Sequence, residues 1–531
     1  MKHGRTCVLL GLVLAASTLL IGCAQAPLDY PRTASWALSN PEQTRMAREL
    51  GPQLAAHPAQ SGFYLLPNGP DALVTRLALV DAAERTLDSQ CFILEDDSVG
   101  NLLLDRVLAA AERGVRVRLL VDDWNQKGHD RRLAWLGAQP NIEVRLFNPA
   151  GSPRSCSLTR PLHYVFGPKR VLRRMHNKSM IVDNTVAIVG GRNIADGYYT
   201  ASDDYNFGDI DILAAGPIAG QVSVSFDEFW NDRLAIPIEA FVSRDETAGY
   251  SLETRRKFEA SMAAALCSPY ADYLRESGPA AKTLEIGQLP LIWAEGEVLY
   301  DWPSKVLTSI DKDPSAYMFF KLKEILDGAT TEAMMISPYF VPGESGMDCC
   351  RQMRNRGVTV KVLTNSLAST DEIAPHAAYE KYRADLLRCG VELYELRPEP
   401  DRSGKDKRDH KGSSAGAGLH AKCLIVDRNV VFVGSFNLDP RSVLMDTQNG
   451  IVVRSEELAR QLAAIFARRT STGYAYRVRF LGALRGTNDS RLVWIDEING
   501  KTVHYSDEPM TGPCRRLKAW FLSWLAPEEW L

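Results

Sequence analysis

The sequence predicts an α/β fold that is built twice, because the chain repeats both a motif and an order of secondary-structure elements. The motif is a His, a Lys two positions later, an Asp seven positions after the His, a glycine-rich turn and an Asn 17 positions after the His. Its copies are His176, Lys178, Asp183, Gly190, Gly191 and Asn193, and His420, Lys422, Asp427, Gly434, Ser435 and Asn437. Two copies at matching places in two similar halves indicate one composite functional site.

Each half is expected to begin with a strand, a helix and a second strand. Gly114 and Gly357 close the two helices in nearly the same register, which suits a helix C-terminus leading into a strand. Strand–helix–strand units favour a largely parallel or mixed sheet covered by helices. We expect these elements at residues 89–94, 102–113 and 115–121, and at 334–340, a helix ending at 356, and 358–364.

The chain is long enough for several domains, and the repeat suggests where they begin and end. A linker helix is expected over residues 255–276, packed on both domains. The expected segments are a targeting segment (1–22), an N-terminal extension (23–59), a first domain (60–240), a helical linker (241–285) and a second domain (286–531).

The N-terminus is typical of a signal peptide. Lys2 and Arg5 precede an apolar run that ends in Leu20-Ile21-Gly22-Cys23. This end resembles a bacterial lipobox, which implies cleavage before Cys23 and lipidation of that Cys; an uncleaved anchor or an ordinary signal peptide are the alternatives. Ala24 is not an Asp, which by analogy favours the outer membrane. We therefore expect a lipoprotein that faces the periplasm, anchored stably by several acyl chains.

Composition excludes some classes of function. The net charge of −3 and a charged fraction of 24% are ordinary for a globular protein and argue against a general nucleic-acid binder. Of the ten cysteines, Cys91 and Cys423 lie in apolar, strand-like runs and are predicted to be buried thiols. The other cysteines could form disulfides in an oxidising compartment, but their spacing gives no metal-site signature.

The motif residues suit phosphodiester chemistry without a metal. Residues 175–182 and 419–426 are strand-like, so the His and Lys of each motif point the same way. One His can attack phosphorus and the other can protonate the leaving alkoxide, while two Lys and two Asn hold the non-bridging oxygens. The glycines would let the backbone approach the phosphate. Asp183 and Asp427 fall on the opposite face and are expected to brace the strand or the following turn. No carboxylate-rich or Cys/His cluster is evident, so no metal or cofactor is expected.

The paired motif resembles that of the phospholipase D superfamily. The flanks at 122–123, 336–342, 363–366 and 437–442 resemble bacterial cardiolipin synthases, closest to the C-type branch. The resemblance implies two phospholipase D-like α/β/α sandwich domains related by a pseudo-twofold, with the active site at their interface. It also implies a phosphatidyl-histidine intermediate, with His176 as nucleophile and His420 as general acid.

The chain departs from the family pattern where an acid follows each motif to orient its His. Asp209 fits this position after the first motif, whereas Gln448 stands where Glu is expected after the second. The hypothesis is that His420 has a lowered pKa as a result, or that Asp446 substitutes. The first motif also has Gly191 where the second has Ser435.

We expect an enzyme that transfers a phosphatidyl group between phospholipids to make cardiolipin. The donor would be phosphatidylglycerol or phosphatidylethanolamine and the acceptor phosphatidylglycerol, with the need for an accessory protein left open. The alternatives are a hydrolase that releases phosphatidic acid, a membrane-anchored nuclease, and a non-catalytic scaffold. At the C-terminus, Leu517, Phe521, Trp524 and Leu525 share one helical face with Trp520 beside it. Docking of this face onto the domain core or contact with lipid both fit the pattern.

Overall fold

The computed structural model describes residues 26–126, 128–150, 169–242, 244–277, 288–398, 416–482, 490–498 and 500–525. The expected signal peptide and Cys23 therefore lie outside the described residues. Within the described helices, none is long and apolar enough to cross a membrane.

The two halves have the same strand order. In the first half the strands pair in the order β9 (Ala235–Pro237), β4 (Ile142–Phe147), β3 (Arg116–Asp122), β2 (Thr86–Cys91), β5 (Ser179–Val182), β6 (Val186–Gly190), β8 (Asp211–Ala215) and β1 (Ser61–Leu66). In the second half the order is β18 (Ala475–Phe480), β13 (Glu392–Leu396), β12 (Thr359–Asn365), β11 (Glu332–Ile336), β15 (Cys423–Val426), β16 (Val430–Gly434), β17 (Asn449–Arg454) and β10 (Ile292–Tyr300).

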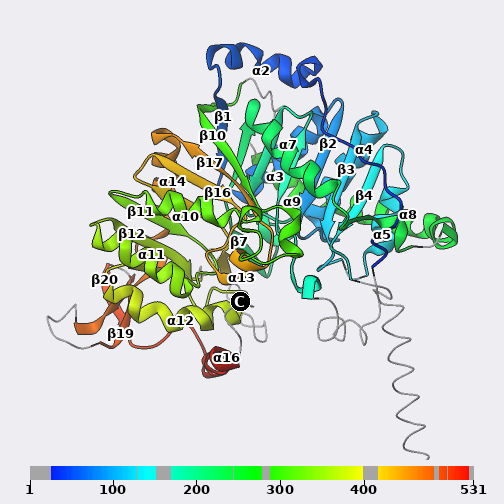
Figure 1. The fold of residues 1–531 in the computed structure, drawn as a ribbon. Helices are drawn as coiled ribbons and strands as arrows, with labels where there is room; N and C mark the ends of the chain where they lie inside the picture. The colour runs from blue at the N-terminus through cyan, green and yellow to red at the C-terminus, as the bar shows by residue number, and fades with distance from the viewer. Residues whose placement is uncertain are drawn as a thin grey trace, which may run out of the picture.

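The sheet is mixed, as the sequence predicts. Strands β2, β3 and β4 are parallel, as are β11, β12 and β13, and the other neighbours in the two orders are antiparallel. Antiparallel pairing of β1 with β10 joins the halves edge to edge, so that they lie side by side (Figure 1). Strands β19 (Leu492–Ile498) and β20 (Lys501–Tyr505) extend the second half.

Helices cover the sheets. Those of the first half are α2 (Arg45–Ala56), α3 (Gly69–Ala82), α4 (Ser98–Glu112), α5 (Asp130–Gly137), α7 (Pro217–Trp230), α8 (Arg244–Leu266) and α9 (Pro269–Ser277). Those of the second half are α10 (Phe319–Asp327), α11 (Gly343–Asn355), α12 (Ile373–Arg388), α13 (Pro440–Leu444), α14 (Glu456–Arg469) and α16 (Pro513–Leu525). Each half is thus an α/β sandwich of matching strand order, which confirms the predicted fold class.

The apolar core follows the same division. One cluster packs α3, α4, α5 and α8 against the first sheet, and another packs α10, α11 and α12 against the second. A third cluster is shared by the two halves and includes Ile181 and Ile212 from the first and Ile425 and Ile451 from the second. This shared core fixes the position of one motif relative to the other.

Local sequence explains where the repeated helix begins and ends. Asp97 caps α4 by accepting a hydrogen bond from the Gly100 N–H, and the helix buries Leu103, Val107 and Ala111 against the sheet. Gly114 and Gly357 follow α4 and α11 with φ of +92° and +86°, a left-handed conformation that favours glycine. The expected helix ends are confirmed.

Two expectations about the elements need correction. The linker is not one helix over residues 255–276. Helix α8 begins at Arg244 and ends at Leu266, and Pro269 starts the separate helix α9. Among the described linker residues, the buried Phe258, Ala265 and Leu274 belong to the first-half core, so the linker does not pack evenly on both halves. Cys91 and Cys423 are buried free thiols, as predicted, and the other cysteines in the described ranges are free as well.

Candidate active site

The first motif histidine lies in an extended segment that pairs with the second half of the chain. Met175 forms an isolated parallel bridge with Thr447, and the His176 N–H donates to the Thr447 carbonyl at 2.9 Å. The His176 Nδ1 lies 2.8 Å from the Gln448 Oε1, and the ring of Phe92 meets the imidazole edge-on at 5.1 Å. Because β5 begins only at Ser179, the predicted strand over 175–182 is shorter than expected and starts after the Lys.

The second motif histidine has the corresponding arrangement, held by the first half of the chain. Strands β7 (Tyr205–Gly208) and β14 (Gly416–Leu419) pair in parallel, and the His420 N–H donates to the Gly208 carbonyl at 3.0 Å. The His420 Nδ1 lies 2.7 Å from Asp209 Oδ2. The rings of Tyr198 and Phe207 pack edge-on against this imidazole at 4.9 and 5.2 Å. Strand β15 likewise begins only at Cys423, after the motif.

The orienting groups are therefore exchanged between the halves. The sequence expectation was that Asp209 orients His176 and that Gln448 orients His420; the structure contradicts both pairings. Each His is held by the other half of the protein, because each motif segment runs beside that half before it enters the sheet of its own half. A rule based on order along the chain cannot see this exchange. Asp446 is not a substitute either, since it binds the Arg174 N–H and the Arg441 guanidinium.

Gln448 is fixed by its own neighbours. Its Oε1 accepts a hydrogen bond from Ser435 Oγ at 2.7 Å, and its Nε2 donates to Ser442 Oγ at 3.0 Å. With the oxygen facing the imidazole, His176 Nδ1 carries the hydrogen and donates to it, which leaves the Nε2 lone pair free. Asp301 accepts the Gln448 backbone N–H at 2.8 Å and completes the support.

Each motif lysine contacts the histidine of its own motif. Lys178 Nζ donates to the His176 carbonyl at 2.8 Å, and Lys422 Nζ donates to the His420 carbonyl and lies 2.9 Å from its Nδ1. All of these groups are buried or half-buried, with His420 4% and Lys422 0% exposed. The expectation that each His and Lys share one side of the segment is confirmed.

Burial and charge set the protonation states of the site. Burial, followed by Lys178 and Lys422, holds the pKa of His176 well below its usual value. Burial and Lys422 lower the pKa of His420 to about 4, against the opposing effect of Asp209. Burial lowers the pKa of Lys422 to about 8. Both imidazoles are therefore neutral at pH 7, while Lys422 is largely protonated.

The motif asparagines complete the arrangement. Asn193 Nδ2 lies 2.9 Å from the Tyr198 hydroxyl. The amide oxygens of Asn193 and Asn437 are buried and have no hydrogen-bond partner among the described residues. Buried amides that are only partly satisfied are costly in a folded protein, so their presence in both motifs indicates a place for a polar ligand.

The sequence of this chain matches those of known proteins. The family described as "Cardiolipin synthase, PLD-like domain" matches residues 77–230 and 322–470, which contain the first and the second motif. The chain belongs to this family. Cardiolipin synthase C of Escherichia coli (strain K12) is 38% identical over 92% of this chain and 99% of its own length. Cardiolipin synthase A of Pseudomonas entomophila (strain L48) is 25% identical over 77% of this chain and 69% of its own length.

A solved structure supports the fold. The crystal structure of phosphatidylserine synthase from Haemophilus influenzae Rd KW20 has a TM-score of 0.50 and 13% identity, and it covers 82% of this chain and 92% of that chain. At this identity the likeness concerns the fold alone. The family match and the 38% identical relative identify the chain as a phosphatidyltransferase of the phospholipase D superfamily, similar to cardiolipin synthases.

In this member of the cardiolipin synthase family, the motif glycines make room for acidic and amide groups. A Cβ on Gly191 would lie 2.3 Å from Asp209 Oδ1, and one on Gly190 would lie 2.0 Å from Asp211 Oδ1. A Cβ on Gly434 would meet the Asn449 carbonyl at 2.4 Å. These contacts give the glycines a packing reason, and the expectation that they admit the phosphate stays a prediction. Gly191 leaves space for Asp209, whereas Ser435 at the matching position donates to Gln448.

The two motif aspartates do not face the histidines. Asp183 accepts hydrogen bonds from the backbone N–H groups of Glu84, Arg85 and Thr86, at 2.7–2.9 Å. Asp427 accepts the N–H groups of residues 330–332 in the second half. Each carboxylate thus holds the start of the neighbouring strand, β2 or β11, which pairs antiparallel with the strand that precedes the Asp. The strand-face argument anticipates that the two Asp face away from the histidines.

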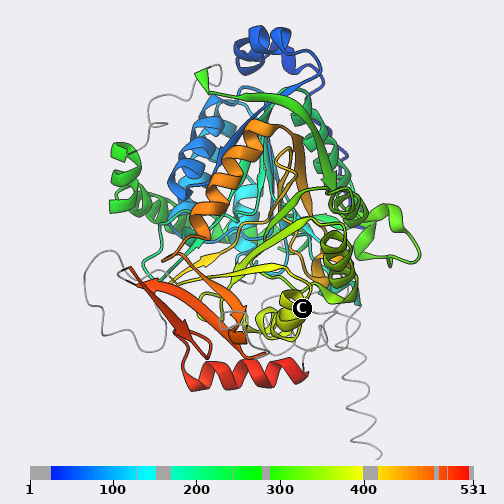
Figure 2. The same cartoon turned by 90° about the vertical axis from the view of Figure 1, so that its left-hand side faces the viewer.

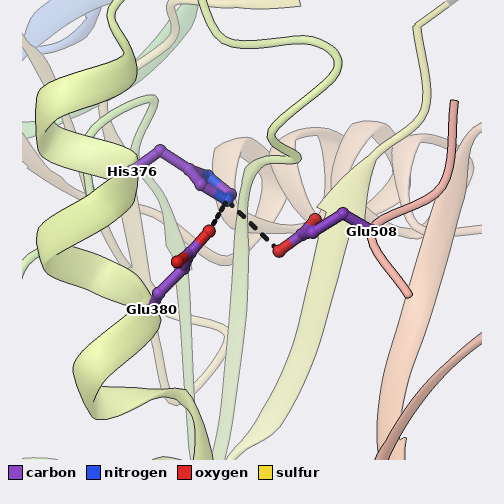
Figure 3. A group of neighbouring side chains, drawn as sticks. All are labelled: His376, Glu380 and Glu508. Atoms are coloured by element: carbon purple, nitrogen blue, oxygen red, sulfur yellow. Dashed lines mark ion pairs between the residues drawn. The ribbon is translucent and has the colours of Figure 1, made fainter. Parts of the chain in front are cut away.

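One group of described side chains outside this site has ligand atoms close enough together to be tested as a metal site. The ligand atoms of His376, Glu380 and Glu508 lie within 4.8 Å of one another, and the His Nε2 is 3.5 Å from each carboxylate (Figure 3). The guanidinium of Arg383, however, lies 2.8 Å from Glu508 and 3.2 Å from His376 Nε2. Burial alone would lower the pKa of His376, but Glu380 and Glu508 raise it to about 9. Two cations already balance the acids, so the group does not fit a metal ion.

Asp301 and Tyr198 belong to none of the motifs or flanks that the sequence singles out, and Ser442 is noted only as part of a flank. Asp301 and Ser442 hold Gln448, and Tyr198 touches both Asn193 and His420. Asp122, noted only as part of a flank, accepts the Met175 N–H at 2.8 Å beside the first motif. Ser442 and Tyr198 lie five residues after Asn437 and Asn193, so the repeat itself would have brought them to notice.

Proposed function

We propose that this chain transfers a phosphatidyl group from one phospholipid to phosphatidylglycerol, making cardiolipin through a phosphatidyl-His176 intermediate. The observation that carries the proposal is the unequal partner of each imidazole: a neutral amide at His176 and a carboxylate at His420. A neutral amide leaves His176 unprotonated and nucleophilic. A carboxylate stabilises an imidazolium, which a general acid requires.

In the first half-reaction His176 Nε2 attacks phosphorus and the bond to the headgroup oxygen breaks. His420 gives its Nε2 proton to the departing alkoxide, so the alcohol leaves neutral. Without substrate His420 is neutral at pH 7, and a bound phosphodiester brings a negative charge that raises the pKa of both His420 and Lys422. Substrate binding and charging of the acid are thus coupled.

In the second half-reaction the acceptor hydroxyl passes its proton to neutral His420 and attacks phosphorus. The bond between phosphorus and His176 Nε2 breaks, and the free imidazole returns. Lys178, Lys422 and the amide groups of Asn193 and Asn437 would hold the non-bridging oxygens throughout. Rotation of the Asn193 amide would let Tyr198 donate to its oxygen and turn the NH₂ toward the phosphate.

The substrates we propose are membrane lipids, with phosphatidylglycerol or phosphatidylethanolamine as donor. The N-terminal sequence supports a location beside them, because it is typical of a signal peptide that ends at a lipidated Cys23. The protein would face the periplasm, anchored in the outer membrane by analogy with lipoproteins that lack Asp after the Cys.

The test is to supply the purified protein with phosphatidylglycerol, with and without phosphatidylethanolamine, and to identify the lipid products. We expect cardiolipin, with glycerol or ethanolamine released according to the donor, and no cardiolipin from His176→Ala or His420→Ala. Phosphatidic acid as the sole product would show a hydrolase instead. The absence of any lipid product would contradict the proposal, and nucleic acid would then be the next substrate to test.

A further inference from the structure

The C-terminal helix α16 presents an apolar stripe to solvent. Leu517, Trp520, Phe521 and Trp524 are 56–77% exposed, and their spacing of three, four and seven residues places them on one helical face. Single exposed apolar residues are common on proteins, whereas a continuous stripe marks an interaction surface. The expectation of docking on the domain core is therefore wrong for this face.

The opposite face of α16 already binds the protein. Ala519 is buried and Leu522 is half-buried, and they pack with Leu367, Ala377 and Ile373 on and before α12. The helix contains apolar residues on two sides, one satisfied by the fold and one left free. A helix that is apolar on both sides covers something on both.

Polar contacts attach α16 to a loop beside the active site. The Arg515 guanidinium donates to the Leu367 carbonyl at 2.7 Å and the Thr370 carbonyl at 2.5 Å. In the same loop, the Ser369 carbonyl accepts from the Tyr205 hydroxyl of β7, the strand that ends beside Asp209. Asp371 accepts from the Tyr339 hydroxyl at 2.9 Å; burial, followed by the charge of Asp371, raises the pKa of the site residue Tyr198.

The start of α16 is fixed as well. Glu508, five residues before the helix, forms the ion pair with Arg383 and approaches His376 on α12 (Figure 3). In both views of the molecule α16 lies at the lower edge below α12, at the end opposite α2 (Figures 1 and 2). The stripe therefore sits on a firmly held helix at one end of the molecule.

We propose that this outer face of α16 lies in the surface of a phospholipid bilayer and sets the active site against it. The chemistry of the helix favours lipid: Trp side chains suit the membrane interface, the helix has no acid, and its Lys518 is exposed. With 13 residues α16 is about 20 Å long, too short to cross a bilayer but suited to lie on one.

A second copy of the chain fits this face less well. Four side chains of this size expose on the order of 500 Å², whereas a stable protein interface buries about 800 Å² on each partner. The choice of lipid also rests on the proposed function, because an enzyme acting on phospholipids must bring its site to their headgroups.

The first experiment replaces Phe521 with the photoreactive analogue p-benzoylphenylalanine in the full-length protein. The protein is bound to vesicles of phosphatidylglycerol and phosphatidylethanolamine, irradiated, and examined by mass spectrometry for lipid adducts. The matched control places the same analogue at Phe320 on α10, which is 43% exposed. We expect phospholipid adducts at position 521 at several times the yield at position 320. Equal yields, no lipid adduct, or an adduct to a second copy of the chain would each overturn the proposal.

A second experiment separates membrane docking from catalysis. Trp524→Ser should lower the rate on vesicles several-fold and leave the rate on dispersed short-chain phospholipid unchanged, while Trp36→Ser, at a residue 60% exposed, should change neither. An equal loss on both substrates would count against docking. The photochemical yield needs no turnover, so it decides the membrane proposal even if the enzyme proves to have another activity.

Discussion

The two motif histidines differ in the side chain that lies beside Nδ1. His176 donates to an amide oxygen that Ser435 and Ser442 fix in place, and His420 faces the carboxylate of Asp209. Burial alone would raise the pKa of Asp209, but His420 and Lys422 bring it below its usual value, so the carboxylate stays charged. The two half-sites are similar in backbone and distinct in electrostatics.

The Gln448→Glu substitution should keep His176 protonated up to a higher pH. A carboxylate beside Nδ1 favours the imidazolium and would raise the pKa of His176. Because protonated His176 cannot attack, the acid limb of kcat/KM should move to higher pH. The measurement is the pH dependence of kcat/KM for wild type and Gln448→Glu. The control Gln448→Asn keeps a neutral amide, so an acid limb that moves equally in both variants would refute the electrostatic reason.

Lys422 should set the alkaline limb. Burial lowers its pKa to about 8, so the free enzyme loses the ammonium above that pH and kcat/KM should fall. The limb in kcat should lie at higher pH, because bound phosphate favours the charged form. Lys422→Arg retains the charge to much higher pH and should remove the limb from whatever activity it keeps. A limb near pH 8 that persists in Lys422→Arg would assign it to another group.

At the scale of elements, the motif aspartates connect parallel strands to the motif turns. Asp183→Ala would leave three backbone N–H groups without their acceptor, one of them buried and two half-buried, a loss on the order of 2 kcal/mol. We expect its Tm to fall by several degrees in thermal unfolding. Asp427→Ala is the matched control: the N–H groups of Thr330 and Thr331 are exposed, so water can replace the carboxylate and the fall should be smaller. Loss of activity without loss of stability would instead indicate a catalytic role for Asp183.

The elements show what sequence can and cannot predict. The order of strands and helices, the helix ends at Gly114 and Gly357, and the buried Cys91 and Cys423 follow from local patterns, and the structure confirms them. The motif segments were predicted as strands, yet they run as extended chain beside the other half before β5 and β15 begin. Pairing across the halves, such as that of Met175 with Thr447, leaves no local pattern.

At the scale of the whole molecule, the repeated strand order places the motifs across one shared core. Each half contributes the group that orients the other half's His, so the site is complete only when both halves are joined. The sequence predicts that the two motifs form one site because they are duplicated. It cannot predict the exchange of Asp209 and Gln448, because that depends on how the two halves are placed in space.

The central claim is that His176 is the nucleophile and His420 the acid and base. The most direct measurement is mass spectrometry of the His420→Ala protein after reaction with a phosphatidyl ester of p-nitrophenol, a leaving group that needs no acid. The first step should proceed and the second should stall without a base, so we expect a phosphatidyl adduct on His176, with nitrophenol released in a stoichiometric burst. His176→Ala should release none, and thermal unfolding should show that both variants are folded. An adduct on His420 in the His176→Ala protein, or burst kinetics without any adduct on His176, would contradict the assignment.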